Sequence, residues 1–573
     1  MSAPPHSQYL HVPHKDNYRY VTLSHCWGKP KSVLGQLKLT SKTEESFKKD
    51  GIELRELPKT YRDALLFACR LDKVGYMWID SLCIKQRMSD SATKKQGGAE
   101  EDWLEQSRVM DKIYRNSFLN ISATAATDSR QGLFFERRPE YLWEDEINVN
   151  YTVSSLGGIT QTSSTKEDSL TRCTLVDCSF WDDLVSHAPV NSRAWVLQER
   201  LMAPRVLHFC RDQIAWECRE FEDAEGHPEL NLTTIKARQG DVVDESRLKD
   251  LREEAGLALR NSRLKGLADP DNGMKYLYVF ELWKRIVEIY SRTHLTVPSD
   301  KLIALAGIAR LFHEEHFCKS NEYIAGMWST CLESQLLWQV NEDYRDGVFE
   351  NPARRDATRA PSFSWASIDT PYGITYGDAT DYGQGDGDPV QNPGRSSDGG
   401  ISSPSAELLF KVVDHNITIS DKQNAFGMVD VGGMLLLRPH FLRPIKLNRL
   451  EPAHRVPYSW YLADTDDPAE HSNLYLDTPE ADVDIFKADA ELFILPAAYG
   501  ERTAHKWDRY LFCLLLKLEK RDSVAAASFK KLGGPGFLSS YRRIGITKLS
   551  NYADGDGQND LKSKRSDELM CLK

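Results

Sequence analysis

The sequence predicts an α/β fold for its N-terminal part, with a Rossmann-like or flavodoxin-like parallel sheet, followed by a helical middle segment and a β-rich C-terminal domain. Three observations favour this organisation. Strand and helix patterns alternate between residues 20 and 124, as in a parallel sheet joined by crossover helices. Residues 245–340 are helical in composition. From about residue 361, short strands follow one another between turns, which is typical of a sandwich or a barrel-like domain.

The alternating region contains three predicted strands, YVTLS (20–24), YMWID (76–80) and FLNISAT (118–124). Between the first two, Pro58 is expected to open a helix and Gly75 to close it. One face of that helix is apolar, with residues at helical spacing: Tyr61, Ala64, Leu65, Ala68 and Leu71. A second helix is expected over about 101–115.

Further along, RAWVLQERL (193–201) is a predicted helix, and RVLHF (205–209) and QIAWEC (213–218) are a predicted pair of strands. We therefore divide the chain into an N-terminal arm (1–19), the α/β domain (20–200), a mixed, mainly helical region (201–360) and the β-rich domain (361–573). Residues 376–405 are rich in Gly, Asp, Ser and Pro and lack apolar periodicity, which predicts a disordered insertion.

Composition and charge argue against several function classes. The formal net charge of −11 disfavours broad binding to nucleic acid. The longest apolar run, Tyr510–Leu516, is far shorter than the ~20 residues that span a bilayer, so no membrane segment is expected. The eleven cysteines include no CxxC pair and indicate free thiols in a reducing compartment. Without an apolar signal region, the chain is expected in the cytoplasm. No metal site is expected, because His and Cys do not occur at ligand spacing.

Polar residues at two predicted strand ends form the candidate site. Ser24 and His25 follow the first strand, and Asp80 and Ser81 end the second. Parallel sheets bind ligands beyond the carboxyl ends of their strands, so these side chains meet if the two strands are neighbours. Alternatively, Ser24 and Asp80 only cap the turns that follow. Cys26 beside His25 does not predict a nucleophile and base, because neighbours on an extended segment point to opposite faces.

The order of several phrases resembles one family closely: YVTLSHCWG (20–28), LPKTYRDALLFACRL (57–71), YMWIDSLCIKQ (76–86), DWLEQSRVMDKIYRNS (102–117) and RAWVLQER (193–200). They resemble the HET domain of fungal heterokaryon-incompatibility proteins, and further phrases extend the likeness to about Thr370. The resemblance implies a role in non-self recognition between fused hyphae and in the programmed cell death that follows.

The resemblance also implies a distant similarity to TIR domains, some of which cleave NAD⁺ with a glutamate on a helix. The corresponding HET phrase, Trp-x-x-(Glu or Gln)-(Ser or Ala)-x-x-Met, begins here at Trp103 and places Gln106 at the polar position. At 100° per residue, Glu105 lies on the opposite face of that helix, where a solvated ion-pairing role is expected. Gln is neither an acid–base catalyst nor a glycosyl acceptor, although it can hydrogen-bond a nucleotide. NAD therefore stays possible as a ligand, and its hydrolysis is disfavoured.

The remaining motif residues are expected to be structural. They are Trp27, Trp78, Trp103, Arg193, Trp195 and Glu199. For Arg193 and Glu199 we expect a buried or half-buried ion pair in preference to a ligand role.

Two hypotheses remain open after the sequence. The first, which we prefer, is a death-inducing signalling or interaction module with a protein partner or self-association. The second is a TIR-like enzyme that acts on NAD⁺ or a related nucleotide. A third, weaker hypothesis is a protein that keeps the fold without the incompatibility role.

Overall fold

The computed structural model describes most of the chain and divides it into two compact units. The described residues are 7–8, 19–28, 37–86, 97–137, 145–150, 170–175, 177–226, 234–238, 241–264, 276–317, 321–345, 348–376, 408–450, 456–466, 468–502, 509–522, 529, 538–550, 561–562, 566 and 568–573. Unit 1 comprises Met1–Gln106, Lys112–Ser192 and Glu199–Asp250, and unit 2 comprises Ser107–Asp111, Arg193–Gln198 and Leu251–Lys573. The domain boundaries expected from the sequence stay a prediction.

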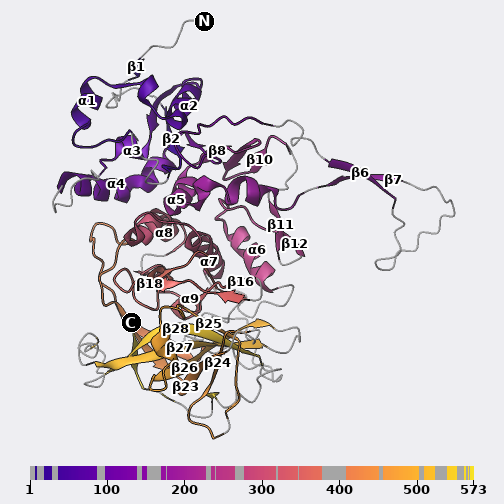
Figure 1. Cartoon of the computed structure of the whole chain (residues 1–573), viewed down its shortest axis with the longest axis vertical. Coiled ribbons are helices and arrows are strands. Elements are labelled where there is room, and N and C mark those ends of the chain that lie inside the picture. Colours follow the sequence, from indigo (N-terminus) through magenta and orange to yellow (C-terminus); the bar gives the residue numbers. More distant parts are fainter. Residues whose placement is uncertain are drawn as a thin grey trace, which may run out of the picture. The chain divides into compact units, whose positions relative to one another are not determined.

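A six-stranded sheet is the centre of unit 1, in the order β10-β9-β8-β5-β2-β4. Its strands β2, β8 and β10 are labelled in Figure 1. Its strands are β2 (Arg19–Ser24), β4 (Val74–Trp78), β5 (Leu119–Ser122), β8 (Arg205–Phe209), β9 (Ile214–Cys218) and β10 (Glu222–Ala224). The first four are parallel, and β9 and β10 continue the sheet antiparallel. Counted along the chain, the parallel strands lie in the order 2-1-3-4. The predicted α/β fold with a parallel sheet is confirmed.

β2 is an interior strand of the sheet, between β4 and β5. Its residues from Val21 to Ser24 are all buried, as expected for a parallel strand that is covered on both faces. Helix α2 (Lys59–Ala68) packs its predicted apolar face onto this core through Tyr61 and Ala64. The helix ends at Ala68, however, and the predicted end at Gly75 is wrong. A turn through Lys73, which has φ 57°, leads into β4, and Gly75 lies within that strand.

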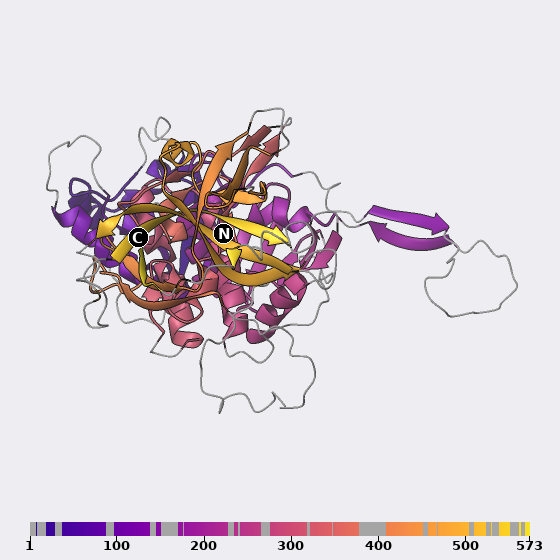
Figure 2. The same cartoon turned by 90° about the horizontal axis from the view of Figure 1, so that it is seen from below.

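The remaining elements of the N-terminal half of the chain lie wholly or partly in unit 1, and α4 and α5 each contribute a segment, residues 107–111 and 194–198, to unit 2. The remaining elements are β1 (Ser7–Gln8), α1 (Glu44–Lys49), β3 (Ile52–Glu53), α3 (Asp80–Cys83), α4 (Gly97–Arg115), β6 (Asp145–Asn150), β7 (Leu170–Leu175), α5 (Ala194–Met202), β11 (Ile235–Arg238) and β12 (Asp241–Asp244). Short 3₁₀ and π turns occupy Leu54–Glu56, Asp182–Ser186 and Pro189–Ser192. Part of the predicted arm is ordered, since β1 pairs with β3. β6 and β7 form a hairpin that stands apart from the six-stranded sheet in both views (Figures 1 and 2).

Unit 2 begins with a helical part that matches the predicted composition. Its helices are α6 (Glu253–Leu264), α7 (Leu277–Ser291), α8 (Ala306–Glu315) and α9 (Leu332–Gln335), with 3₁₀ turns at Pro298–Lys301, Ile303–Leu305 and Trp365–Ser367. Small paired strands lie among them: β13 (Tyr323–Ile324), β14 (Met327–Trp328), β15 (Gln339–Val340), β16 (Asp343–Arg345), β17 (Val348–Glu350), β18 (Arg354–Arg355), β19 (Ile368–Asp369) and β20 (Ile374–Thr375).

Two tryptophans fix the turn between β13 and β14. The turn residues Ala325 and Gly326 both have positive φ, 46° and 98°, the conformation of tight hairpin turns. The indole nitrogens of Trp283 and Trp365 donate to the Gly326 carbonyl at 3.2 and 3.0 Å. A buried carbonyl in a strained turn thus receives two donors, which satisfies both of its lone pairs.

The C-terminal part of unit 2 is a single nine-stranded sheet rather than two separate sheets, with the order β21-β22-β29-β28-β27-β26-β23-β24 and β25 beside β28. Its strands are β21 (Phe410–Asn416), β22 (Met434–Pro439), β23 (Arg443–Arg449), β24 (Tyr458–Leu462), β25 (Leu474–Leu476), β26 (Leu492–Arg502), β27 (Arg509–Asp522), β28 (Leu538–Ser550) and β29 (Met570–Leu572), and a 3₁₀ turn covers Val483–Phe486. The β-rich C-terminal region is therefore confirmed. The predicted disordered insertion, apart from Tyr376, lies outside the described residues.

Within the described part of the chain, no helix has the length and apolar character needed to cross a membrane. Among the same residues, no group of three or more His, Cys, Asp or Glu side chains is placed to hold a metal ion.

Candidate functional site

The carboxyl ends of β4, β2 and β5 bring the predicted polar residues of unit 1 together. β2 lies between the other two strands, with Thr22 opposite Trp78 on one side and Ser24 opposite Ser122 on the other. Asp80 and Ser81 begin α3 immediately after β4. We call the resulting group the strand-end cluster, defined by Ser24, His25, Trp27, Tyr61, Asp80, Ser81, Tyr114, Asn120 and Glu199.

One half of the cluster is centred on Ser24, which is buried at the end of β2. Its hydroxyl donates to the carboxylate of Glu199 on α5 at 2.5 Å. The amide of Asn120 on β5 donates back to the Ser24 hydroxyl at 3.0 Å. Thr22, one pleat earlier on the same strand, donates to the Asn120 carbonyl oxygen at 3.0 Å. Ser24 and Glu199 are only 1% and 2% exposed, so this pair is closed to solvent.

The second half of the cluster joins His25 to α2 and α3. The His25 Nε2 lies 2.8 Å from the Tyr61 hydroxyl, and the same hydroxyl lies 2.8 Å from the Ser81 hydroxyl. The His25 and Tyr61 rings also meet edge to face, with centroids 4.8 Å apart. Both side chains are buried, at 1% and 0% exposure. Tyr61 thereby serves as core residue and as polar bridge between two motif residues.

Asp80 links this buried core to a more exposed rim. Its carboxylate accepts from its neighbour Ser81 N at 2.7 Å and from the Trp27 indole nitrogen at 3.2 Å. The Asp80 Oδ1 lies 3.9 Å from the His25 Nδ1, which is beyond hydrogen-bond distance. Lys38 lies over the Trp27 ring, 4.6 Å from its centroid. Asp80, Trp27 and Lys38 are all partly exposed, so they form the rim at which solvent reaches the cluster.

The charges around the cluster are mostly negative on the buried side. Burial raises the pKa of Tyr114 well above its ordinary value, and the carboxylates of Glu199 and Asp80 raise it further. Tyr114 is therefore a neutral hydroxyl at any physiological pH. On the rim, burial lowers the pKa of Lys38, and Asp80 partly offsets this effect.

Residues 20–199 match the family model described as heterokaryon incompatibility protein (HET). This match covers the strand-end cluster in full. The chain is a HET domain-containing protein. No curated protein and no solved structure matches it.

The HET phrase on α4 has the orientation predicted from the sequence. Glu105 is exposed, whereas Met110 and Tyr114 on the other face are buried and Gln106 is half-buried. No hydrogen bond connects Gln106 to the strand-end cluster among the described residues. Trp103 lies half-buried on the same helix. The role of Gln106 in ligand binding stays a prediction.

The other motif residues of the HET domain divide between the two units. Trp78 packs edge to face against Tyr114, with centroids 5.5 Å apart, and the Trp27 indole nitrogen donates to the Asp80 carboxylate. The structural role expected of both tryptophans stays a prediction. Arg193 forms a backbone bridge with His294, and Trp195 is half-buried on α5. Arg193 belongs to unit 2 and Glu199 to unit 1, so their expected ion pair stays a prediction.

Sequence reasoning missed Tyr61, Tyr114 and Asn120 as members of the cluster and assigned Glu199 a structural role only. Tyr61 was visible as an apolar helix position, but its hydroxyl gave no separate signal. Asn120 was the better clue, because an amide in the middle of a buried strand requires a partner. Glu199 stands 175 residues from Ser24, and nothing in the local pattern links them.

Chemically, the cluster is better suited to holding a shape than to turnover in this conformation. A serine hydroxyl that donates to a carboxylate is the arrangement of a nucleophile and its base. However, a substrate cannot reach Ser24 or Glu199 while both are buried. The groups available to a ligand are those of the rim, an indole, a carboxylate and an ammonium.

Proposed function

We propose that this protein is an incompatibility-type effector whose HET domain signals by interaction, in fungal non-self recognition and the programmed cell death that follows. The observation that carries the proposal is the convergence of the HET phrases on one closed polar network. Ser24, His25 and Asp80 come from two strand ends, and Tyr61 and Glu199 come from two helices.

A closed network of this kind fixes one arrangement of strands and helices. Each buried polar group costs on the order of 1–3 kcal/mol if its partner is lost, so the members hold one another in place. An interaction domain needs such a rigid surface, whereas a hydrolase also needs a cavity that its substrate can enter. A partner protein, or a second copy of the chain, would bind at the rim formed by Trp27, Lys38 and Asp80.

The alternative is a TIR-like enzyme that hydrolyses NAD⁺, or a domain that binds a nucleotide without cleaving it. The 2-1-3-4 order of the parallel strands supports the binding form, because such sheets bind ligands where the order reverses. The hydrolytic form has less support. Glu105 is exposed on α4, and the carboxylate that is close to Ser24, Glu199, is buried. As part of the proposed effector role, we also propose that the protein acts in the cytoplasm.

The test is inducible expression in a filamentous fungal host, with cell viability and cellular NAD⁺ measured in the same culture. Wild-type protein is expected to kill the host without prior loss of NAD⁺. Asp80→Asn, at the rim, is expected to abolish killing at unchanged protein level. The matched control is Glu105→Gln, an exposed carboxylate outside the cluster, which should kill like wild type.

Two outcomes contradict the proposal. If accumulated wild-type protein leaves the host viable, the effector role is wrong. If purified protein consumes NAD⁺ and Glu199→Gln abolishes the turnover, the domain is an enzyme and the proposed interaction role is wrong.

A further inference from the structure

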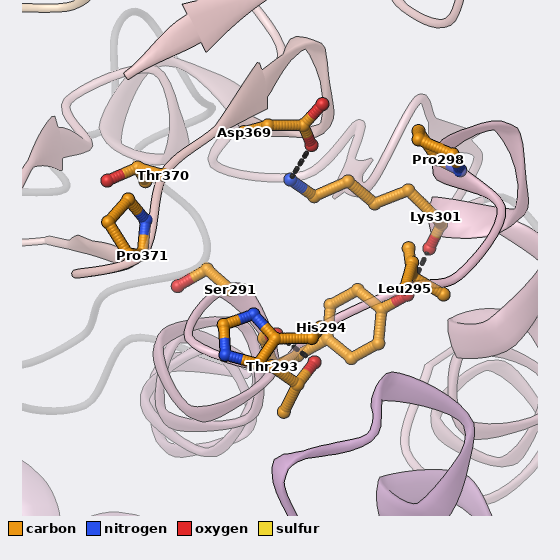
Figure 3. A pocket seen from close by; sticks show the side chains of 10 residues that line it. Ser291, Thr293, His294, Leu295, Pro298, Lys301, Asp369, Thr370 and Pro371 are labelled. Atoms are coloured by element: carbon orange, nitrogen blue, oxygen red, sulfur yellow. Dashed lines mark hydrogen bonds and ion pairs between the residues drawn. The ribbon is translucent and has the colours of Figure 1, made fainter. Parts of the chain in front are cut away.

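A cavity in unit 2 lies between the end of α7 and the loop after β19 (Figure 3). The residues that line it do not belong to the strand-end cluster. Its volume is about 340 Å³, which is within the range of small-molecule sites. It is lined by Tyr290, Ser291, Thr293, His294, Leu295, Pro298, Lys301, Asp369, Thr370 and Pro371. The phrase that contributes most of these residues, YSRTHLTVPSDK (290–301), has no part in the proposed HET function.

Lys301 is more buried than Asp369, the other charged side chain of the lining. Its side chain is 7% exposed, and its ammonium donates to the Ile368 carbonyl and, at 3.2 Å, to the Asp369 carboxylate. An ammonium has three N–H groups. One therefore remains beyond these two acceptors among the described residues, and an unmade bond from a buried ammonium is costly.

Two cations share one carboxylate beside the cavity. Asp369 contacts Lys301 and Arg359, whose guanidinium lies 2.9 Å from both carboxylate oxygens. Burial lowers the pKa of Lys301 to about 8, although Asp369 raises it and Arg359 lowers it further, so Lys301 is still mostly protonated at neutral pH. Asp300, which is buried in the same turn, is a second negative charge near Tyr290. An anionic oxygen that accepted the remaining Lys301 N–H would form a charge-assisted hydrogen bond.

The walls of the cavity are held in place before any ligand arrives. The Tyr290 hydroxyl donates to the Lys301 carbonyl at 2.6 Å, and Arg359 donates to the Pro298 carbonyl at 3.1 Å. The Ser291 hydroxyl accepts from Ile374 N at 2.9 Å. A preformed site loses little conformational entropy on binding, which favours affinity.

We propose that this cavity binds a small molecule through a carboxylate or phosphate group, with Lys301 and His294 contacting the oxyanion. His294 is exposed and lines the cavity across from the Lys301–Asp369 pair, as Figure 3 shows. The rings of Pro298 and Pro371 and the side chain of Leu295 form apolar wall for the carbon part of the ligand. This site is independent of the HET function proposed above.

The experiment is isothermal titration of the full-length protein with three matched probes at constant ionic strength. Phenyl phosphate and benzoate share a ring and differ in their anionic group, and benzyl alcohol has the ring without the charge. We expect at least one anion to bind saturably, with a dissociation constant below about 1 mM, and benzyl alcohol to bind at least tenfold more weakly. The stronger of the two anions identifies the class of natural ligand.

Variants locate the binding. Lys301→Met is expected to weaken it roughly tenfold or more, since a charge-assisted hydrogen bond is lost. The matched control is Lys411→Met, an exposed lysine on β21, which should leave the affinity unchanged. If Lys301→Met does not fold, His294→Gln and Pro371→Trp test the same site, because both positions are exposed; the first removes a contact and the second fills the opening.

The proposal is overturned if neither anion binds saturably to the wild type. It is also overturned if benzyl alcohol binds as tightly as the anions, or if the folded pocket variants keep wild-type affinity.

Discussion

Glu222, on the edge strand β10, should destabilise unit 1 above neutral pH. It lies directly opposite Glu217 in the antiparallel pair of β10 and β9, and both side chains are buried. Like charges at opposed positions repel each other. Glu217 is the carboxylate that pairs with the nearby basic side chains. Arg200 donates to both of its oxygens at 2.7 and 2.9 Å, and the His208 Nε2 lies 3.2 Å from one of them. Although burial works to raise the pKa of Glu217, Arg200, His208 and Lys249 hold it well below the ordinary value.

Glu222 is left with the opposite shift. Burial and then the charge of Glu217 raise its pKa from 4.5 to about 7, against the opposing effects of Arg200, Lys236 and Arg247. The folded state therefore binds more protons than the unfolded state between pH 4.5 and 7, so stability falls as pH rises through this window. The full penalty is present above pH 7. From these two pKa values, it is about 3 kcal/mol at pH 8 and about 1 kcal/mol at pH 5.

Glu222→Gln removes the titration and keeps the shape of the side chain. We expect the variant to gain about 2 kcal/mol more stability at pH 8 than at pH 5, which corresponds to about 4–8 °C in the melting temperature of a unit of this size. Scanning calorimetry of the full chain from pH 5 to pH 9 measures it and separates the transitions of the two units. The control is Glu220→Gln, an exposed carboxylate two residues earlier, which should show no such difference. A gain that is the same at both pH values would refute the reasoning.

Two further predictions concern unit 2, and urea unfolding at pH 7 measures both. Gly326→Ala should cost about 2–4 kcal/mol, because the added Cβ would lie 2.9 Å from the Trp365 ring at a residue with φ +98°. Gly432→Ala, with φ +96° and nothing within 4 Å, should cost only the backbone part, about 1 kcal/mol, and equal losses would contradict the packing argument. Arg543→Lys should cost about 2–4 kcal/mol, because the buried guanidinium stacks 3.4 Å above the Trp338 ring and lies 3.2 Å from Asp477. Its neighbour Arg542, whose partners Asp482 and Glu519 are 18% and 41% exposed, should lose less, within about 1 kcal/mol, and a similar loss at both would exclude the stacked pair as the cause.

Local periodicity was sufficient to predict the strands and helices of the α/β domain and to predict which side chains of its helices are buried. The apolar spacing after Pro58 predicted the buried face of α2, and the 100° step on α4 predicted an exposed Glu105. Such patterns repeat within one or two turns, so a single sequence contains them. Helix ends are less certain, because they depend on turns: Gly75 looked like a helix end, and the positive φ that reverses the chain belongs to Lys73.

The partners inside each site were out of reach for a different reason. Ser24 meets Asn120 and Glu199 across 96 and 175 residues, and the cavity beside Lys301 is completed by a loop that begins at Asp369. No local pattern records which distant residues will meet, because the fold as a whole decides it. The sequence could therefore predict that polar strand ends gather, from the rule for parallel sheets, but not which carboxylate joins them.

The Glu199 carboxylate bears on whether the HET domain has a catalytic acid. The sequence directs attention to α4, where Gln106 replaces the acid that hydrolysis would require. The structure places the Glu199 carboxylate 2.5 Å from the Ser24 hydroxyl, on a different helix. Gln106 alone therefore does not decide whether the domain catalyses, because Ser24 and Glu199 bring a hydroxyl and a carboxylate together elsewhere, both buried in this structure. A HET domain that used Ser24 and Glu199 for catalysis would have to expose them to its substrate, and the loss of the Ser24–Glu199 and Ser24–Asn120 hydrogen bonds opposes that change.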